Sequence, residues 1–119
     1  MKQPLTALLI APDEGMRYDI ETGQKTITIR EGHRDYRAGQ AVMLSCHLVP
    51  WAVQADITDV KHCVLREVTE DEWRDDGFVS QDDLLTQMHR FYPALTLDSA
   101  VTVIRWTNAR GALVERHDA

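Results

Sequence analysis

The chain has 119 residues, 44% hydrophobic and 27% charged, a balance typical of one compact globular domain. Its formal net charge of −6 argues against a general DNA- or RNA-binding protein, because such proteins hold phosphates with a surplus of Lys and Arg. No apolar run approaches the roughly 18 residues of a membrane helix, and the N-terminal segment is too weakly apolar for a signal peptide. We therefore expect a cytoplasmic protein without membrane or DNA partners, whose two cysteines are reduced.

The first part of the chain predicts a strand, a helix and a second strand. Residues Thr6–Ala11 form a short apolar run that suits a buried strand. A helix is expected over residues 13–22, with Asp13 as its N-cap and Gly23 at its end. The following segment, Lys25–Arg30, alternates isoleucines with threonines, and such a run of β-branched residues indicates a strand.

The remainder predicts further strands and two short helices. We expect a loop over 31–40, strands over 41–49 and 51–68, a helical turn over 69–73, a helix beginning after Ser80 and a strand over 100–107. The second helix should turn four apolar residues inward: Leu84, Leu85, Met88 and Phe91. Residues 1–107 then form a single domain, and residues 108–119 a flexible C-terminal tail. This order predicts an α+β fold, a small curved mixed sheet or β-barrel with two or three short helices.

The segment GQKTITIR, residues 23–30, carries the most information about function. It joins a helix-ending glycine, a lysine, and a strand whose second face presents Thr26, Thr28 and Arg30. From the spacing alone, a solvated polar face of an antiparallel strand is the simplest interpretation.

The same segment resembles the GxKxxxxR signature of the ASCH-domain superfamily, which is related to the PUA RNA-binding fold. With threonine in the middle of the signature, it is similar to the small bacterial N4-acetylcytidine amidohydrolases. Weaker similarities are the basic loop after Arg30, Gly39, the sequence Phe91-Tyr92-Pro93 and the final VTVIRW strand, so the resemblance extends from Leu5 to Trp106. It implies a PUA-like fold and a hydrolase of an N4-acylated cytosine nucleoside, with no cofactor.

In the enzymes that the chain resembles, a lysine acts as general base, a threonine as nucleophile and a glutamate as proton donor. The resemblance places the first two roles on Lys25 and Thr28. The third falls on Asp76, which is shorter than glutamate, and Asp75 and Glu72 are neighbouring candidates. A threonine hydroxyl becomes nucleophilic when a base takes its proton, and lysine can be that base only if its pKa falls from about 10.4.

Geometry constrains the lysine. Residues 25 and 28 are three apart, and a regular strand would send their side chains to opposite faces. Lys25 must therefore lie in the turn after Gly23, outside the strand, where glycine permits the necessary backbone conformation. Three further residues are expected to contact the substrate: Arg30, which could also stabilise the oxyanion, Thr26 and Tyr92.

The sequence also offers a candidate metal site and a function other than catalysis. Cys46-His47 and His62-Cys63 look like a mirrored metal site, but adjacent strand residues point to opposite faces, so no metal is expected. The second hypothesis is a non-catalytic RNA-binding module, with phosphate contacts from four basic residues: Lys25, Arg30, Arg34 and Arg37. Salt-dependent affinity for RNA, without turnover of acylated cytidines, would distinguish that module from the enzyme.

Overall fold

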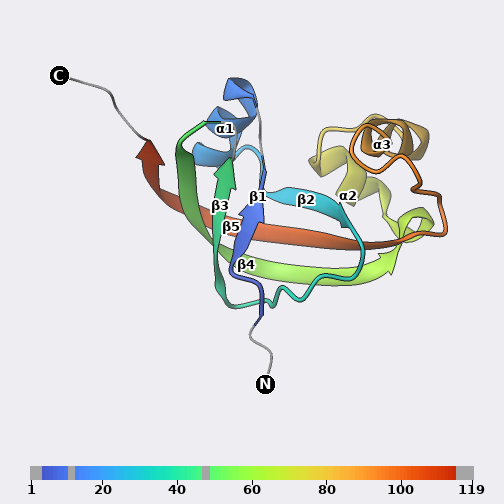
Figure 1. Cartoon of the computed structure of the whole chain (residues 1–119), viewed down its shortest axis with the longest axis horizontal. Coiled ribbons are helices and arrows are strands. Elements are labelled where there is room, and N and C mark those ends of the chain that lie inside the picture. The colour runs from blue at the N-terminus through green and yellow to red at the C-terminus, as the bar shows by residue number, and fades with distance from the viewer. Residues whose placement is uncertain (1–3, 11–12, 47–48, 115–119) are drawn as a thin grey trace.

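Five strands form one curled mixed sheet in the computed structural model, which describes residues 4–10, 13–46 and 49–114. The strands are β1 (Ala7–Leu9), β2 (Ile27–Glu31), β3 (Ala41–Cys46), β4 (Trp51–Val64) and β5 (Ala100–Val114). Their spatial order is β1-β3-β4-β5-β2, with β1 parallel to β3 and the other neighbours antiparallel. The sheet curls into a half-barrel whose two edge strands are β1 and β2 (Figure 1). The predicted α+β fold is confirmed.

The pairing of β4 with β5 is the longest in the sheet and extends further than the sequence predicts. Its register runs from Val64 opposite Ala100 to Trp51 opposite Val114. The expectation of a flexible tail over 108–119 is therefore wrong for residues 108–114, which continue β5. An ion pair between Arg110 and Asp56, 3.0 Å long, crosses to β4 within this extension. Residues 115–119 lie outside the described part of the chain.

Three short α-helices begin at side-chain caps that the sequence predicts. They are α1 (Glu14–Glu21), α2 (Glu70–Asp75) and α3 (Gln81–Met88), and a 3-10 turn, Leu65–Glu67, precedes α2. Asp13, Thr69 and Ser80 each accept a hydrogen bond from a backbone N–H of the first turn. Because α3 ends at Met88, its inward face does not reach Phe91, which is 68% exposed rather than buried as expected. None of the described helices is long and apolar enough to cross a membrane.

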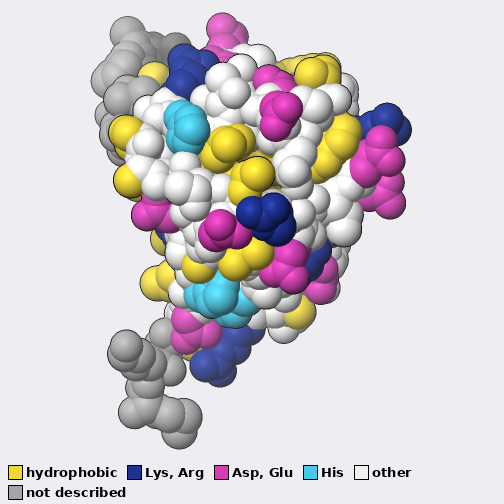
Figure 2. Space-filling model, turned by 90° about the vertical axis from the view of Figure 1, so that its right-hand side faces the viewer, with side chains coloured by type: hydrophobic (Ala, Val, Ile, Leu, Met, Phe, Trp, Pro, Cys, Tyr) yellow, Lys and Arg dark blue, Asp and Glu magenta, His cyan; other side chains and the backbone are white. Residues whose placement is uncertain are grey.

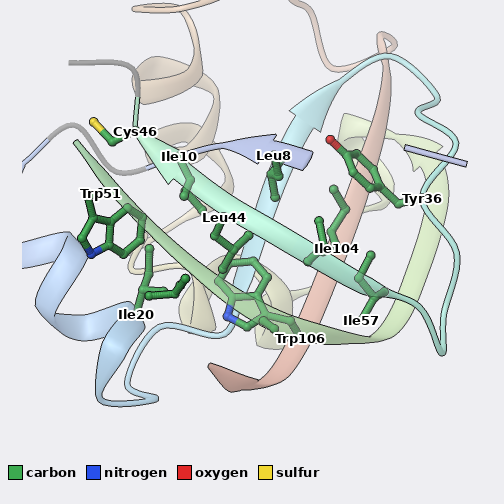
Figure 3. Packing of buried hydrophobic residues seen from close by; sticks show 13 residues of the cluster. Leu8, Ile10, Ile20, Tyr36, Leu44, Cys46, Trp51, Ile57, Ile104 and Trp106 are labelled. Atoms are coloured by element: carbon green, nitrogen blue, oxygen red, sulfur yellow. The ribbon is translucent and has the colours of Figure 1, made fainter. Parts of the chain in front are cut away.

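Apolar side chains pack on both faces of the sheet. The first cluster fills the inside of the half-barrel and includes Leu8, Ile20, Leu44, Trp51, Ile57, Ile104 and Trp106 (Figure 3). The second packs against α3 and includes Ile27, Ile29, Cys63, Leu84, Met88, Val101 and Val103. Since Thr28 lies opposite Ile104 in the register, Thr28 and Arg30 point to the inner face of the half-barrel, away from α3.

Side chains close the seam between the edge strands β1 and β2. The Tyr36 hydroxyl donates a hydrogen bond of 2.7 Å to the carbonyl of Ala7, and Arg30 Nη2 donates one of 2.9 Å to the carbonyl of Leu9. The carbonyls of Ala7 and Leu9 face away from β3. On the other side of β1, the N–H of Met43 donates to the carbonyl of Thr6, and the N–H of Ile10 donates to the carbonyl of Ser45. The guanidinium of Arg30 is therefore held in the seam, on the same face of β2 as Thr28.

Candidate functional site

Lys25 lies in the turn between α1 and β2, as the sequence predicts. Gly23 has a φ of +81°, in the left-handed region that glycine adopts without strain. The backbone N–H groups of Gln24 and Lys25 both donate to the carbonyl of Asp19, which fixes the turn. From there the Lys25 side chain runs along the start of β2, and its Nζ donates a 2.8 Å hydrogen bond to the carbonyl of Ile27.

The structure brings Lys25 and Asp76 together, although they are 51 positions apart in the chain. Lys25 Nζ forms an ion pair with Asp76 Oδ1, and the two side chains are only 13% and 7% exposed. Asp76 is the C-cap residue of α2, so the end of this helix delivers the carboxyl to the turn before β2. The result is a largely buried carboxyl–amine pair at the start of β2.

Burial raises the pKa of Asp76 above the ordinary 3.8, although the nearby charges of Lys25 and Arg30 act in the opposite direction. A carboxyl with a raised pKa holds its proton to a higher pH and can donate it to a leaving group. Asp76 is therefore suited to exchanging a proton, and the amine of Lys25 is its hydrogen-bond partner.

Thr28 is the middle threonine of the signature and is 5% exposed on the inner face of β2. Its hydroxyl forms no hydrogen bond with any residue of the described segments, including Lys25. Lys25 Nζ instead binds the carbonyl of Ile27, which belongs to the peptide group leading into Thr28. Within the described segments, the Thr28 hydroxyl therefore has no hydrogen-bond partner that a substrate would need to displace.

Arg30 adds a positive charge and an unused donor to this face. Its Nη2 binds the carbonyl of Leu9, whereas its buried Nε has no hydrogen-bond partner among the described residues. A buried N–H without a partner is unfavourable, and a substrate oxygen would satisfy it. Thr26, another substrate-binding candidate, lies just before β2 and is half-buried. Its carbonyl accepts a 2.9 Å hydrogen bond from the N–H of Trp106.

The other two acid candidates have different partners. Asp75 is 52% exposed and pairs with Arg105 at 2.9 Å. Glu72 is buried, and its carboxylate accepts hydrogen bonds from Lys61 Nζ at 2.9 Å and from the N–H of Thr69 at 2.8 Å. Burial opposes the ionisation of Glu72, but these hydrogen bonds outweigh it and lower its pKa. Of the three candidates, Asp76 contacts Lys25.

Tyr92 lies at the other end of β2 from Lys25, next to residues of the loop that follows the strand. Its hydroxyl is 3.4 Å from Arg34 Nη2, and its ring packs against the cluster on the α3 side of the sheet. Tyr36 lies in the seam, where its hydroxyl binds the carbonyl of Ala7. Burial raises the pKa of Tyr36, while the charges of Arg34 and Arg30 counteract this effect.

The two cysteines belong to different packing clusters, Cys46 to the inner one and Cys63 to the one facing α3. His47 lies outside the described residues, and within those residues no three potential ligands gather around one point. A cavity of about 320 Å³ is lined by six residues near the end of β2: Glu31, Gly32, Ala94, Leu95, Ser99 and Ala100. It does not include Lys25, Thr28 or Asp76.

Comparison with solved structures relates this fold to ASCH domains. The ASCH protein of Zymomonas mobilis has a TM-score of 0.62 and 13% identity, over 91% of this chain and 71% of that chain. The ASCH domain of Lactobacillus crispatus has a TM-score of 0.61 and 15% identity, over 87% and 79%. A protein of Enterococcus faecalis has a TM-score of 0.62 and 11% identity, over 100% and 88%. No protein-family model and no curated protein matches the sequence.

Proposed function

Because the chain has the ASCH-domain fold, in agreement with the sequence resemblance, we propose that it is an amidohydrolase that removes the acyl group from N4-acetylcytidine or a related N4-acylated cytosine nucleoside. The observation that carries this proposal is the buried contact between Lys25 and Asp76 at the start of β2, the strand that carries the buried Thr28. A base, an acid and a nucleophile are the set that cleavage of an amide bond requires, and these three residues are of those chemical types.

The Lys25–Asp76 pair reacts in its neutral form. A shift of one proton along their hydrogen bond converts the ammonium and carboxylate into an amine and a carboxylic acid. This form has the same number of protons as the ion pair, so no proton from solvent is needed to reach it. The amine is then a base for Thr28, and Asp76 is an acid for the leaving group.

In the first step the Thr28 oxygen forms a bond to the acyl carbon, and its proton moves to Lys25 Nζ. The bond between the acyl carbon and N4 then breaks, and Asp76 gives its proton to N4, so that cytidine leaves with a free amino group. Arg30 Nε, which has no partner in the described structure, donates a hydrogen bond to the carbonyl oxygen as negative charge develops there. The step ends with an acyl-threonine, an ammonium and a carboxylate.

In the second step water hydrolyses the acyl-threonine. The Asp76 carboxylate accepts a proton from the attacking water, and the Lys25 ammonium returns one to the Thr28 oxygen as the ester bond breaks. The free carboxylic acid leaves, and the amine and the carboxylic acid of the enzyme are restored. Both steps therefore use the same pair with its roles exchanged.

The competing hypothesis of an RNA-binding module is less well supported. Two of its four expected phosphate contacts are occupied by carboxylates, since Lys25 pairs with Asp76 and Arg37 pairs with Asp35. A phosphate would have to displace these partners.

The test is chromatography of the purified full chain after incubation with N4-acetylcytidine in a buffer that contains EDTA. We expect cytidine and acetate in equal amounts. Absence of cytidine would contradict the proposal. Activity that vanishes with the chelator and returns with zinc would indicate that the nucleophile is a metal-bound water and not Thr28.

A further inference from the structure

Arg30 and Arg34 form no ion pair with a carboxylate of the described residues, on a chain of net charge −6. In the described segments, five other arginines pair with carboxylates: Arg37, Arg66, Arg74, Arg105 and Arg110. Arg90 also lacks an ion pair with a described residue, but it is exposed just after α3. Arg30 and Arg34 differ from it because both are half-buried and each donates a hydrogen bond to a backbone carbonyl, Arg30 to that of Leu9 and Arg34 to that of Glu31.

The register of the sheet gives the position of Arg34 relative to Thr28. The backbone N–H of Arg34 donates a 2.8 Å hydrogen bond to the buried hydroxyl of Thr102, and Thr102 lies opposite Arg30 in β5. The pair Arg30–Thr102 is two residues along the sheet from the pair Thr28–Ile104, which corresponds to about 7 Å. Arg34 is therefore anchored beyond Arg30, at the end of the seam away from Lys25 and Asp76.

The Arg34 side chain is held in place by neutral partners. Its Nε donates a 3.0 Å hydrogen bond to the carbonyl of Glu31, and its Nη2 is 3.4 Å from the hydroxyl of Tyr92. The Glu31 carboxylate is on an exposed residue and forms no ion pair with Arg34 in the described structure. A positioned guanidinium whose charge is not neutralised suits a phosphate group, which accepts several hydrogen bonds from one arginine.

We propose that Arg34 and Tyr92 bind the phosphate of the substrate, and that the preferred substrate is an N4-acylated cytidine 5′-monophosphate rather than the free nucleoside. The identity of the acylated end rests on the proposed function. In such a nucleotide the phosphate and the N4-acyl group lie at opposite ends of the molecule, as Arg34 and the Lys25–Asp76 pair lie at opposite ends of β2.

A mononucleotide fits the charges better than a longer RNA does. On the end of the molecule that carries α3, acidic and basic side chains are interspersed, without a continuous basic track (Figure 2). A longer strand would pass these carboxylates, whereas one phosphate contacts only Arg34 and Tyr92.

Binding of cytidine 5′-monophosphate and of cytidine to the full chain, measured by calorimetry or NMR titration, tests the phosphate site without turnover. We expect the nucleotide to bind about ten- to a hundredfold more tightly. Arg34→Gln should abolish this preference and leave cytidine binding unchanged, and Arg34→Lys should restore part of it. Arg90→Gln, which removes the same charge from an exposed position, should keep the preference. Thermal unfolding of each variant checks that the fold is intact.

Three results would overturn the phosphate site as proposed: equal binding of nucleotide and nucleoside, a preference that persists in Arg34→Gln, or a short oligoribonucleotide that binds far more tightly than the mononucleotide with a steep salt dependence. The two proposals fail separately. Arg34-dependent binding of the nucleotide without turnover of any acylated cytidine contradicts the amidohydrolase alone. Turnover with equal kcat/KM for acylated nucleoside and nucleotide contradicts the phosphate site alone.

Discussion

Glu72 and Asp76 lie one helical turn apart at α2, and each binds a different lysine. Glu72 accepts a hydrogen bond from Lys61 of β4, and Asp76 pairs with Lys25 of the turn before β2. Their pKa values shift in opposite directions, because Glu72 is supported by several hydrogen bonds whereas burial dominates at Asp76. Two carboxyl groups on one helix are thus suited to different tasks, one to remaining ionised and the other to exchanging a proton.

Replacing Asp76 by asparagine should lower kcat/KM for N4-acetylcytidine by roughly a hundredfold or more, because the transferable proton is lost while the shape is kept. Asp76→Glu should retain substantial activity, since it keeps the carboxyl. Asp75→Asn is the matched control and should be nearly silent, because Asp75 is half-exposed and pairs with Arg105. A kcat/KM that falls strongly in Asp75→Asn and stays normal in Asp76→Asn would assign the role of proton donor to Asp75.

Thr28→Ala should fold normally and lose turnover by orders of magnitude, because the hydroxyl that forms the acyl intermediate is gone. Thr26→Ala is the comparison, since Thr26 lies just before β2 and contributes a backbone carbonyl that binds the N–H of Trp106. It should have a far smaller effect on the rate. Similar losses in both variants, or a rate near wild type in Thr28→Ala, would contradict the role of Thr28.

The pH profile of kcat/KM should have an acidic limb above pH 3.8. The reactive pair holds one shared proton, and a second proton leaves an ammonium and a carboxylic acid without any base. Activity is therefore lost as the pH falls through the pKa of Asp76, which burial raises above the ordinary 3.8. Because the two groups are coupled, the limb reports the pair. A kcat/KM that keeps its neutral-pH value down to pH 3.8 would contradict this prediction.

Glu72→Gln should reduce the free energy of unfolding by about 1–2 kcal/mol at pH 7, because a buried carboxylate loses charged hydrogen bonds. The pKa of Glu72 is lowered in the folded state, so its stabilising effect is present above the ordinary value of 4.5 and disappears as the pH falls through the lower folded value. The difference between variant and wild type in urea unfolding should therefore vanish in acid.

Glu70→Gln is the matched control for that measurement, because Glu70 is exposed and pairs with Arg74 on the same helix. Its effect should stay within about 0.5 kcal/mol at either pH. A Glu72→Gln difference that is as large in acid as at neutral pH would show that the amide disturbs packing rather than removing a charge.

Local patterns predicted the elements that form from neighbouring residues. Asp13 caps α1 as expected, and the alternation in Lys25–Arg30 gives β2 with Thr28 on the face opposite to Ile27 and Ile29. The extension of β5 was missed because Gly111 and the charged residues around it resemble a chain end, whereas pairing with β4 holds that segment in the sheet. Pairing with a long neighbouring strand therefore outweighs the weak strand propensity of the segment itself.

The candidate site was only partly predictable. The family resemblance pointed to Lys25 and Asp76, but their contact depends on how the end of α2 packs against the turn after α1. No spacing rule joins residues 51 positions apart. The seam was missed for the same reason, since Tyr36 reaches Ala7 across a gap that only the curl of the sheet creates.

The seam also affects how copies of the chain behave toward one another. An edge strand with free N–H and carbonyl groups is a template on which a strand of another molecule can add, and this is a common start of aggregation. Here the N–H of Leu5 donates to the carbonyl of Asp35, and Gln40 Nε2 donates to the carbonyl of Leu5. With the carbonyls of Ala7 and Leu9 also occupied, an incoming strand must break these four contacts before it can pair along this edge, and this disfavours strand addition here.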